Sequence, residues 1–209
     1  MTFVSSLRMT VAARAFGLIA ILAVAACSTT EPLLNSERIE KKFGTFGIDL
    51  IASDSRKRIA NLYSMEGGRR VCRTWATVQF PDVIDSRVTS EHVRILGGQP
   101  MGAVFKANGW QISKRNLQIG SRPLTPLDNE MVQMMQIPKS AKIAYHTYVF
   151  SVSKDGHALD YAVITETHHP DYLSRTDLEE IYGTVAETAA DVRLTLGSGA
   201  APVVSYHGI

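Results

Sequence analysis

The sequence predicts an α+β domain, in which an antiparallel sheet built from hairpins has helices packed on one face. Two pairs of strand-like segments flank the short turn sequences "MEGG" (65–68) and "KDG" (154–156), as the strands of hairpins do. Short segments with helix start and stop residues are interleaved with these hairpins. Hairpins that alternate with helices in this way are typical of an antiparallel sheet covered by helices.

The first half of the chain supplies one hairpin and three helices. Asn35 and Ser36 can cap a helix that runs to about Phe43, and a strand is expected over 45–52. The first hairpin then joins "RIANLYS" (58–64) to "RRVCRTWATVQF" (69–80). Two short helices are expected after it, one from Ser90 to Leu96 before a glycine pair, and one over "MGAVFKAN" (101–108).

The second half repeats the alternation. "WQISKRNLQIG" (110–120) alternates as a strand, and a helix is expected over 128–136 after a loop with two prolines. The second hairpin joins 142–153 to 157–169 and is followed by a helix from Ser174 to about Tyr182. Ser174 and Asp177 have the spacing of a capping box. The methionines of 128–136 are interpreted as an ordinary core face.

The first 26 residues have the composition of an export signal. Arg8 and Arg14 are their only charged residues, and an uncharged stretch rich in small and aliphatic residues follows over 15–26. That stretch is shorter than the roughly 20 residues needed to span a bilayer. The sequence therefore predicts a segment that is removed after export.

The end of this segment, Val24-Ala25-Ala26-Cys27, resembles a bacterial lipobox. The resemblance covers only the first thirty or so residues. It implies cleavage between Ala26 and Cys27 and acylation of Cys27, so that acyl chains would hold the protein to a membrane. Ser28 stands where an aspartate would retain such a protein in the inner membrane, so the resemblance implies sorting to the periplasmic face of the outer membrane.

These observations predict four segments. They are a signal peptide over 1–26, a lipidated tether over 27–35, a single α+β domain over 36–185 and a mobile tail over 186–209. The tail is assigned because its sequence is rich in small residues and poor in aromatic ones.

Charge and cysteine usage exclude some classes of protein. Two of the 22 Lys and Arg residues and none of the 20 Asp and Glu residues lie in 1–26, so the rest is formally neutral. A neutral domain argues against nucleic-acid binding, which needs a basic face. If Cys27 is acylated, Cys72 has no partner, and its place in an alternating strand predicts a buried, inert thiol.

The candidate catalytic residues are His146, His168, His169 and Asp171. Adjacent residues of a strand face opposite sides, so His168 and His169 cannot both point to one face, but a turn at Pro170 could aim His169, Asp171 and Glu166 outward together. His146 lies on the partner strand, near 165–167 in the expected register. Imidazole and carboxylate groups suit acid–base work, yet the spacing typical of zinc ligands is absent, and a packing role for these residues is favoured.

No nucleophile, phosphate-binding or metal motif accompanies these histidines, and no cofactor or metal is predicted. The basic run Arg56-Lys57-Arg58 is interpreted as a solvated edge.

The leading hypothesis is a non-catalytic outer-membrane lipoprotein of the cell envelope that binds an envelope protein or a cell-wall component. The first alternative is a periplasmic hydrolase or metal-dependent enzyme that uses the four candidate residues. The second is a carrier of an apolar ligand, with a pocket between sheet and helices lined by Trp75, Phe105 and Trp110.

Overall fold

The computed structural model describes residues 33–185, 192–193 and 203–204, all within one of the two compact units of the chain, Pro32–Ile209. The fold is α+β, as predicted. The strands are β1 (Gly47–Ser53), β2 (Lys57–Glu66), β3 (Arg69–Gln79), β4 (Gln111–Pro123), β5 (Lys142–Lys154), β6 (His157–His168), β7 (Val192–Arg193) and β8 (Val203–Val204). The α-helices are α1 (Asn35–Phe43), α2 (Thr89–Leu96), α3 (Met101–Ala107), α4 (Asn129–Met135) and α5 (Arg175–Tyr182), and the 3-10 turns are η1 (Ser86–Val88) and η2 (Pro126–Asp128).

Six of these strands form one antiparallel sheet in the order β1-β2-β3-β6-β5-β4. Two meanders, β1-β2-β3 and β4-β5-β6, meet where β3 pairs with β6. Both predicted hairpins, β2-β3 and β5-β6, are confirmed. The short strands β7 and β8 pair with each other.

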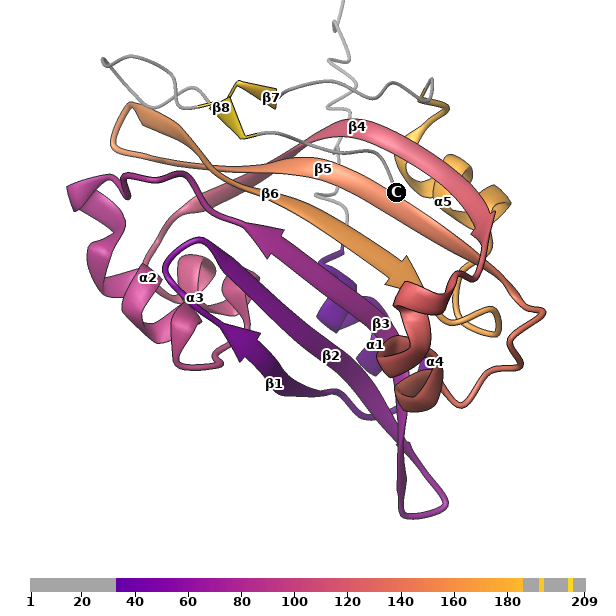
Figure 1. Cartoon of the computed structure of the whole chain (residues 1–209). Coiled ribbons are helices and arrows are strands. Elements are labelled where there is room, and N and C mark those ends of the chain that lie inside the picture. The colour runs from indigo at the N-terminus through magenta and orange to yellow at the C-terminus, as the bar shows by residue number, and fades with distance from the viewer. Residues whose placement is uncertain (1–32, 186–191, 194–202, 205–209) are drawn as a thin grey trace, which may run out of the picture. The chain divides into compact units, whose positions relative to one another are not determined.

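Helices lie on both faces of the six-stranded sheet (Figure 1). Helices α1, α2, α3 and α5 pack on one face, which we call the inner face. Helix α4 alone lies on the opposite, outer face, where Met131 and Met135 pack against Cys72 and Ile143. The methionines of α4 are thus core residues, and Cys72 is a buried free thiol, as predicted.

Period-two alternation sorts the strand residues between the two faces. In β2 and β3 the residues Ala60, Leu62, Ala76 and Val78 face inward and join the core beneath the helices. Phe105 of α3 lies at the centre of an aromatic cluster of this core, in contact with the rings of Trp110, Phe150 and Tyr161.

Helix and turn chemistry follows the sequence closely. Ser174 accepts a hydrogen bond from the Asp177 amide at 3.2 Å and Asp177 accepts one from the Ser174 amide at 2.7 Å, which confirms the predicted capping box of α5. Asn35 differs from expectation, because its side chain is buried and bonds to Thr74 and Tyr172 instead of capping α1. None of the helices in the described part of the chain is long and apolar enough to cross a membrane.

The turn of the β5-β6 hairpin supplies a test of the fold. Asp155 and Gly156 both have positive φ, of 52° and 77°, as in a type I′ turn. We expect Gly156→Ala to lower the free energy of unfolding by about 1 kcal/mol, because a Cβ atom disfavours the left-handed region. Urea unfolding measures this. The control is Gly97→Ala, since Gly97 has a φ of −74° and its added Cβ meets nothing closer than 3.4 Å. Equal losses in both variants would contradict the assignment.

Candidate functional site

Two of the predicted candidates, His146 and His168, come together on the inner face of the sheet. His146 in β5 pairs directly with Glu166 in β6, and His168 lies two residues farther along β6 on the same face. His146 stacks on the Tyr182 ring of α5 at 4.2 Å between centroids, and His168 meets the edge of the Tyr172 ring. The predicted nearness of His146 to 165–167 is therefore confirmed.

A buried hydrogen-bond network joins these residues to α1. The Asn35 amide donates to the Thr74 hydroxyl at 3.1 Å, and that hydroxyl contacts Nδ1 of His168 at 3.0 Å. The Tyr172 hydroxyl donates to Oδ1 of Asn35 at 2.7 Å. The network fixes α1 to β3, β6 and the turn before α5 with side chains that are almost wholly buried.

Both imidazoles are neutral at neutral pH. Burial, with Lys114 as the next cause, lowers the pKa of His146 to about 2. Burial lowers the pKa of His168 to about 4 against the opposing effect of Glu166. Among the described residues, Nδ1 of His146 and Nε2 of His168 have no hydrogen-bond partner.

Glu166 connects this network to a cavity. The Tyr148 hydroxyl bonds to the Glu166 side chain, whose Oε2 atom is buried without a partner in the described structure. The cavity, of about 80 Å³, lies on the inner face between the sheet and the helices α1 and α3. Its lining is mostly apolar, and its polar side chains are Asn35, Ser36, Arg58, Lys114, Tyr148 and Glu166. We call this the inner cavity.

Arg58 is the least expected member of the lining. It extends from β2, is only 2% exposed, and has one hydrogen bond, of 3.3 Å, from a terminal nitrogen to the Gly98 carbonyl. Its Nε atom is buried without a partner, and no carboxylate of the described residues pairs with it. Burial lowers the pKa of Arg58, although a guanidinium stays charged in proteins. A buried cation without a counter-ion is costly, so this arrangement suits an anion that arrives from outside.

Lys114 adds a second positive charge to the inner cavity. Its ammonium lies 4.3 Å from the centroid of the Tyr148 ring. With Glu166 as the only carboxylate in the lining, the cavity carries two cations against one anion. A small ligand with an anionic group matches this balance.

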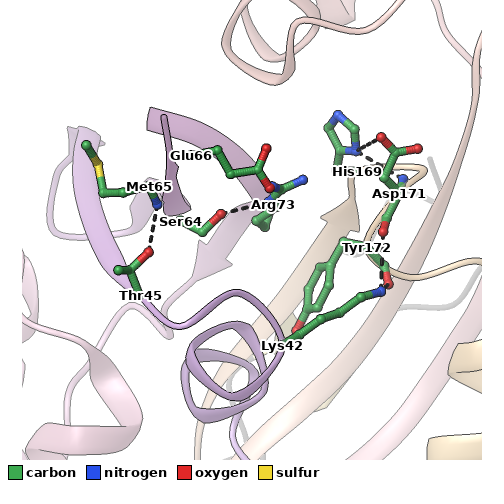
Figure 2. Close-up of polar contacts among 9 residues, drawn as sticks. All are labelled: Lys42, Thr45, Ser64, Met65, Glu66, Arg73, His169, Asp171 and Tyr172. Atoms are coloured by element: carbon green, nitrogen blue, oxygen red, sulfur yellow. Dashed lines mark hydrogen bonds and ion pairs between the residues drawn. The ribbon is translucent and has the colours of Figure 1, made fainter. Parts of the chain in front are cut away.

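His169 and Asp171 do not join His146 and His168. His169 is buried and lies beyond the end of β6, where its Nδ1 accepts a hydrogen bond from the Asp171 amide at 3.0 Å (Figure 2). Its ring also bonds to the Met135 backbone. The Asp171 side chain is 82% exposed. The expectation that His169, Asp171 and Glu166 point outward together is wrong, because Glu166 lies on the inner face. Burial lowers the pKa of His169. Through its bond to the Met135 backbone, His169 links this turn to α4.

The turn that contains Asp171 is also tied to α1. The Lys42 ammonium donates to the backbone carbonyl of Tyr172 at 2.8 Å (Figure 2). On the neighbouring strands, Arg73 pairs with Glu66 and donates to the Ser64 hydroxyl at 2.9 Å. None of the residues that make these contacts lines the inner cavity, so we interpret the contacts as structural.

The structure thus places the four candidates in two separate groups, His146 with His168 and His169 with Asp171. Among the described residues there is no group of three or more His, Cys, Asp or Glu side chains that could hold a metal. Burial raises the pKa of the Cys72 thiol to about 12, so it is no nucleophile at neutral pH.

The three aromatic residues assigned to an apolar-ligand pocket do not share one. Phe105 and Trp110 are buried in the core, where Nε1 of Trp110 donates to Glu91 at 3.1 Å. Trp75 lies on the outer face. The side chains that do line the inner cavity, Arg58, Lys114 and Glu166, were missed. Arg58 could have been recognised because it is in phase with Ala60 and Leu62, the inward-facing residues of β2.

Ala26 and Cys27 lie outside the described residues, and acylation of Cys27 stays a prediction. The predicted tail, 186–209, also lies outside them, apart from β7 and β8.

Comparison with known proteins gives no family. No family model matches the chain, and no curated protein matches it. Among solved structures it is similar to a GntR-family transcriptional regulator from Bacillus cereus, with a TM-score of 0.40, 9% identity, and coverage of 62% of this chain and 94% of that one. It is also similar to a protein described as a transcriptional regulator, from Streptomyces coelicolor, with a TM-score of 0.32, 17% identity, and coverage of 62% and 85%.

Both of these proteins are described as transcriptional regulators, and the comparison contradicts several predictions made from the sequence. The contradicted predictions are the function as an outer-membrane lipoprotein scaffold and the location at the periplasmic face of that membrane. The predicted partners are contradicted as well: they were a membrane and an envelope or cell-wall component, and nucleic acid was excluded. These predictions are withdrawn as wrong. The function proposed below rests on the geometry of the inner cavity alone.

The uncompensated charge of Arg58 gives a first test. We expect Arg58→Met to raise the free energy of unfolding by about 1–3 kcal/mol, because it removes a buried charge while keeping much of the side-chain volume. Urea unfolding at pH 7 measures this. Arg56→Met is the matched control, since Arg56 lies two residues away with a side chain 69% exposed, and it should change little. A large loss of stability in Arg58→Met would show that Arg58 has a structural role.

The buried histidines give a second test. Both folded-state pKa values lie below the ordinary value of 6.5, so the unfolded chain binds more protons as the pH falls below 6.5. Stability is therefore full above pH 6.5 and is lost below it, by about 2 kcal/mol per histidine between pH 7 and pH 5.

Urea unfolding at the two pH values checks this in the wild type, in His146→Gln/His168→Gln, and in His157→Gln, which changes an exposed histidine. The double variant should lose the part of the pH dependence that His146 and His168 contribute, whereas buried His92 and His169, whose pKa values burial also lowers, keep theirs. The control should keep the full dependence. The same dependence in all three proteins would contradict neutral burial of His146 and His168.

Proposed function

We propose that this chain is a binding domain for a small organic anion, a carboxylate with a compact apolar body, which occupies the inner cavity. The observation that carries the proposal is the buried Arg58 guanidinium, which lines the cavity with an unpartnered Nε. A guanidinium binds a carboxylate through two parallel hydrogen bonds, and Nε is one of the donors used in that geometry.

The rest of the lining matches the other parts of such a ligand. Apolar side chains from both layers, such as Ile48, Leu62 and Met101, surround the space and suit a hydrocarbon body. Lys114 adds to the attraction for an anion. The unpartnered Oε2 of Glu166 is a free acceptor among the described residues and so favours a ligand that also carries a hydrogen-bond donor.

The size of the cavity limits the ligand. A water molecule needs roughly 10–15 Å³ of such space, so a volume of about 80 Å³ holds only a few waters or a small molecule. Helix α1 bounds this space through Leu34, Asn35 and Ser36. Its ion pair between Glu37 and Lys106, at 3.0 Å, links it to α3, so both helices that close the cavity are held together.

Isothermal titration calorimetry with benzoate tests the proposal. We expect benzoate to bind and the neutral analogue benzamide to bind at least about tenfold more weakly, because a hydrogen bond to a charged group contributes about 1.5–3 kcal/mol. Arg58→Met should weaken benzoate binding by at least about tenfold, and Arg58→Lys should restore part of it, since a lysine keeps the charge without the paired donors.

Arg56→Met is again the control and should bind benzoate as the wild type does. The urea unfolding of Arg58→Met described above shows whether the variant is folded under the conditions of the titration, and so separates loss of binding from loss of structure. Equal affinity for benzoate and benzamide, binding unchanged by Arg58→Met, or no binding of benzoate would each overturn the proposal.

A further inference from the structure

The outer face of the sheet carries a second cavity, of about 350 Å³, which the proposed function does not use. It lies where η2 and α4 cover the strands β2, β3 and β6. Its lining consists of Lys57, Ile59, Trp75, Thr77, Gln79, Arg122, Leu127, Asp128, Glu130, Met131, Thr165 and Thr167. A volume of this size is within the range of small-molecule sites. We call it the outer cavity.

Strand pairing arranges its floor as rows of side chains. Ile59, Thr77 and Thr165 lie opposite one another across β2, β3 and β6, and Thr147 of β5 continues the row. The next row along β3 and β6 holds Trp75 and Thr167. A half-buried indole therefore lies beside a set of hydroxyl groups on one floor.

Two buried polar atoms of this lining have no hydrogen-bond partner among the described residues, the side-chain oxygen of Gln79 and Nε of Arg122. An unpartnered buried acceptor is costly, so a hydrogen-bond donor supplied by a ligand would stabilise it. In contrast, the Asp128 carboxylate already accepts two hydrogen bonds from Arg122, both at 2.7 Å.

The charge of the lining differs from that of the inner cavity. Lys57 and Arg122 are balanced by Asp128 and Glu130, so the outer cavity is formally neutral. It offers no net attraction to an anion. Neutral hydroxyl groups, in contrast, can both donate to Gln79 and exchange hydrogen bonds with threonines.

The geometry points to a site for a neutral saccharide, with one hexopyranose ring lying on Trp75. A hexopyranose has a face of C–H groups, which carry a small positive charge and pack favourably on the negative face of an indole. Its hydroxyl groups project around the ring, where Thr77, Gln79 and Glu130 are the available partners. An apolar ligand would leave these polar groups desolvated without partners.

Saturation-transfer difference NMR on the whole chain tests this site, with the methyl glycosides of glucose, galactose, mannose and N-acetylglucosamine as probes. We expect at least one to receive saturation, most strongly at the ring protons of a single face. Thr77→Val removes one hydroxyl at equal volume and should weaken binding about fivefold. Trp75→Leu removes the indole and should weaken it at least about tenfold.

Thr176→Val is the matched control, because Thr176 is exposed on α5, away from the lining of either cavity. It should bind the probe as the wild type does. Far-ultraviolet circular dichroism shows whether each variant is folded. If Trp75→Leu is unfolded, the binding measured with Thr77→Val alone tests the inference. Transfer to none of the four glycosides, or transfer that Thr77→Val leaves unchanged, overturns the inference. Because Arg58→Met changes only the inner cavity, the two proposals fail independently.

Discussion

The pairing of β3 with β6 is the constraint on which the rest of the structure depends. It joins two meanders into one sheet and sets Ala76 opposite Glu166 and Thr74 opposite His168. A slip of one residue would turn Glu166 and His168 to the outer face and bring Thr165 and Thr167 inward. The same register therefore determines the chemistry of both cavities. Side chains close to each other in β6 serve different sites because successive residues of a strand alternate.

The register is in turn held by buried polar contacts that tolerate little displacement. The chain of hydrogen bonds from Asn35 through Thr74 to His168 crosses α1, β3 and β6. Such networks favour one arrangement, since a displaced member leaves buried groups unpaired. Arg58 is different, because it lines a cavity and its charge lacks a counter-ion among the described residues. A group that costs stability without holding the fold together is typical of a binding site, where function and stability oppose each other.

The sequence predicted those features that short-range chemistry determines. The hairpin turns follow from Asp155-Gly156 and Gly67-Gly68, whose positive φ values only a few residue types adopt readily. The start of α5 follows from Ser174 and Asp177 in the same way. The buried Cys72 was predicted from the alternation of its strand.

The inner cavity could not be predicted with the same security, because it depends on contacts between distant segments. In the run Arg56-Lys57-Arg58 three like charges suggested a solvated edge, yet only the third is in phase with the apolar residues of β2. Glu166 and His168 are two residues apart in β6 and therefore face the same side of the sheet. The prediction instead grouped Glu166 with His169, which is incorrect. The alternation of strand residues shows which side chains share a face. It does not show which face becomes the core, because that depends on the helices that cover the sheet. The function inferred from the first 27 residues was wrong, and those residues could not report on the sites of the domain.

The contrast between the two faces follows from what covers each of them. On the inner face, helices exclude water from the central strands, so a cation there has a strong preference for an anionic partner. On the outer face, α4 and η2 cover only one region of the sheet. The threonines of β3 and β6 that lie there are neutral, so they create no demand for a charged partner. The hydroxyl and amide groups of this lining can exchange hydrogen bonds with the hydroxyl groups of a ligand. One sheet thus presents a cavity with a net positive lining on one side and a formally neutral cavity on the other, and the two cavities differ in the class of molecule that they can bind.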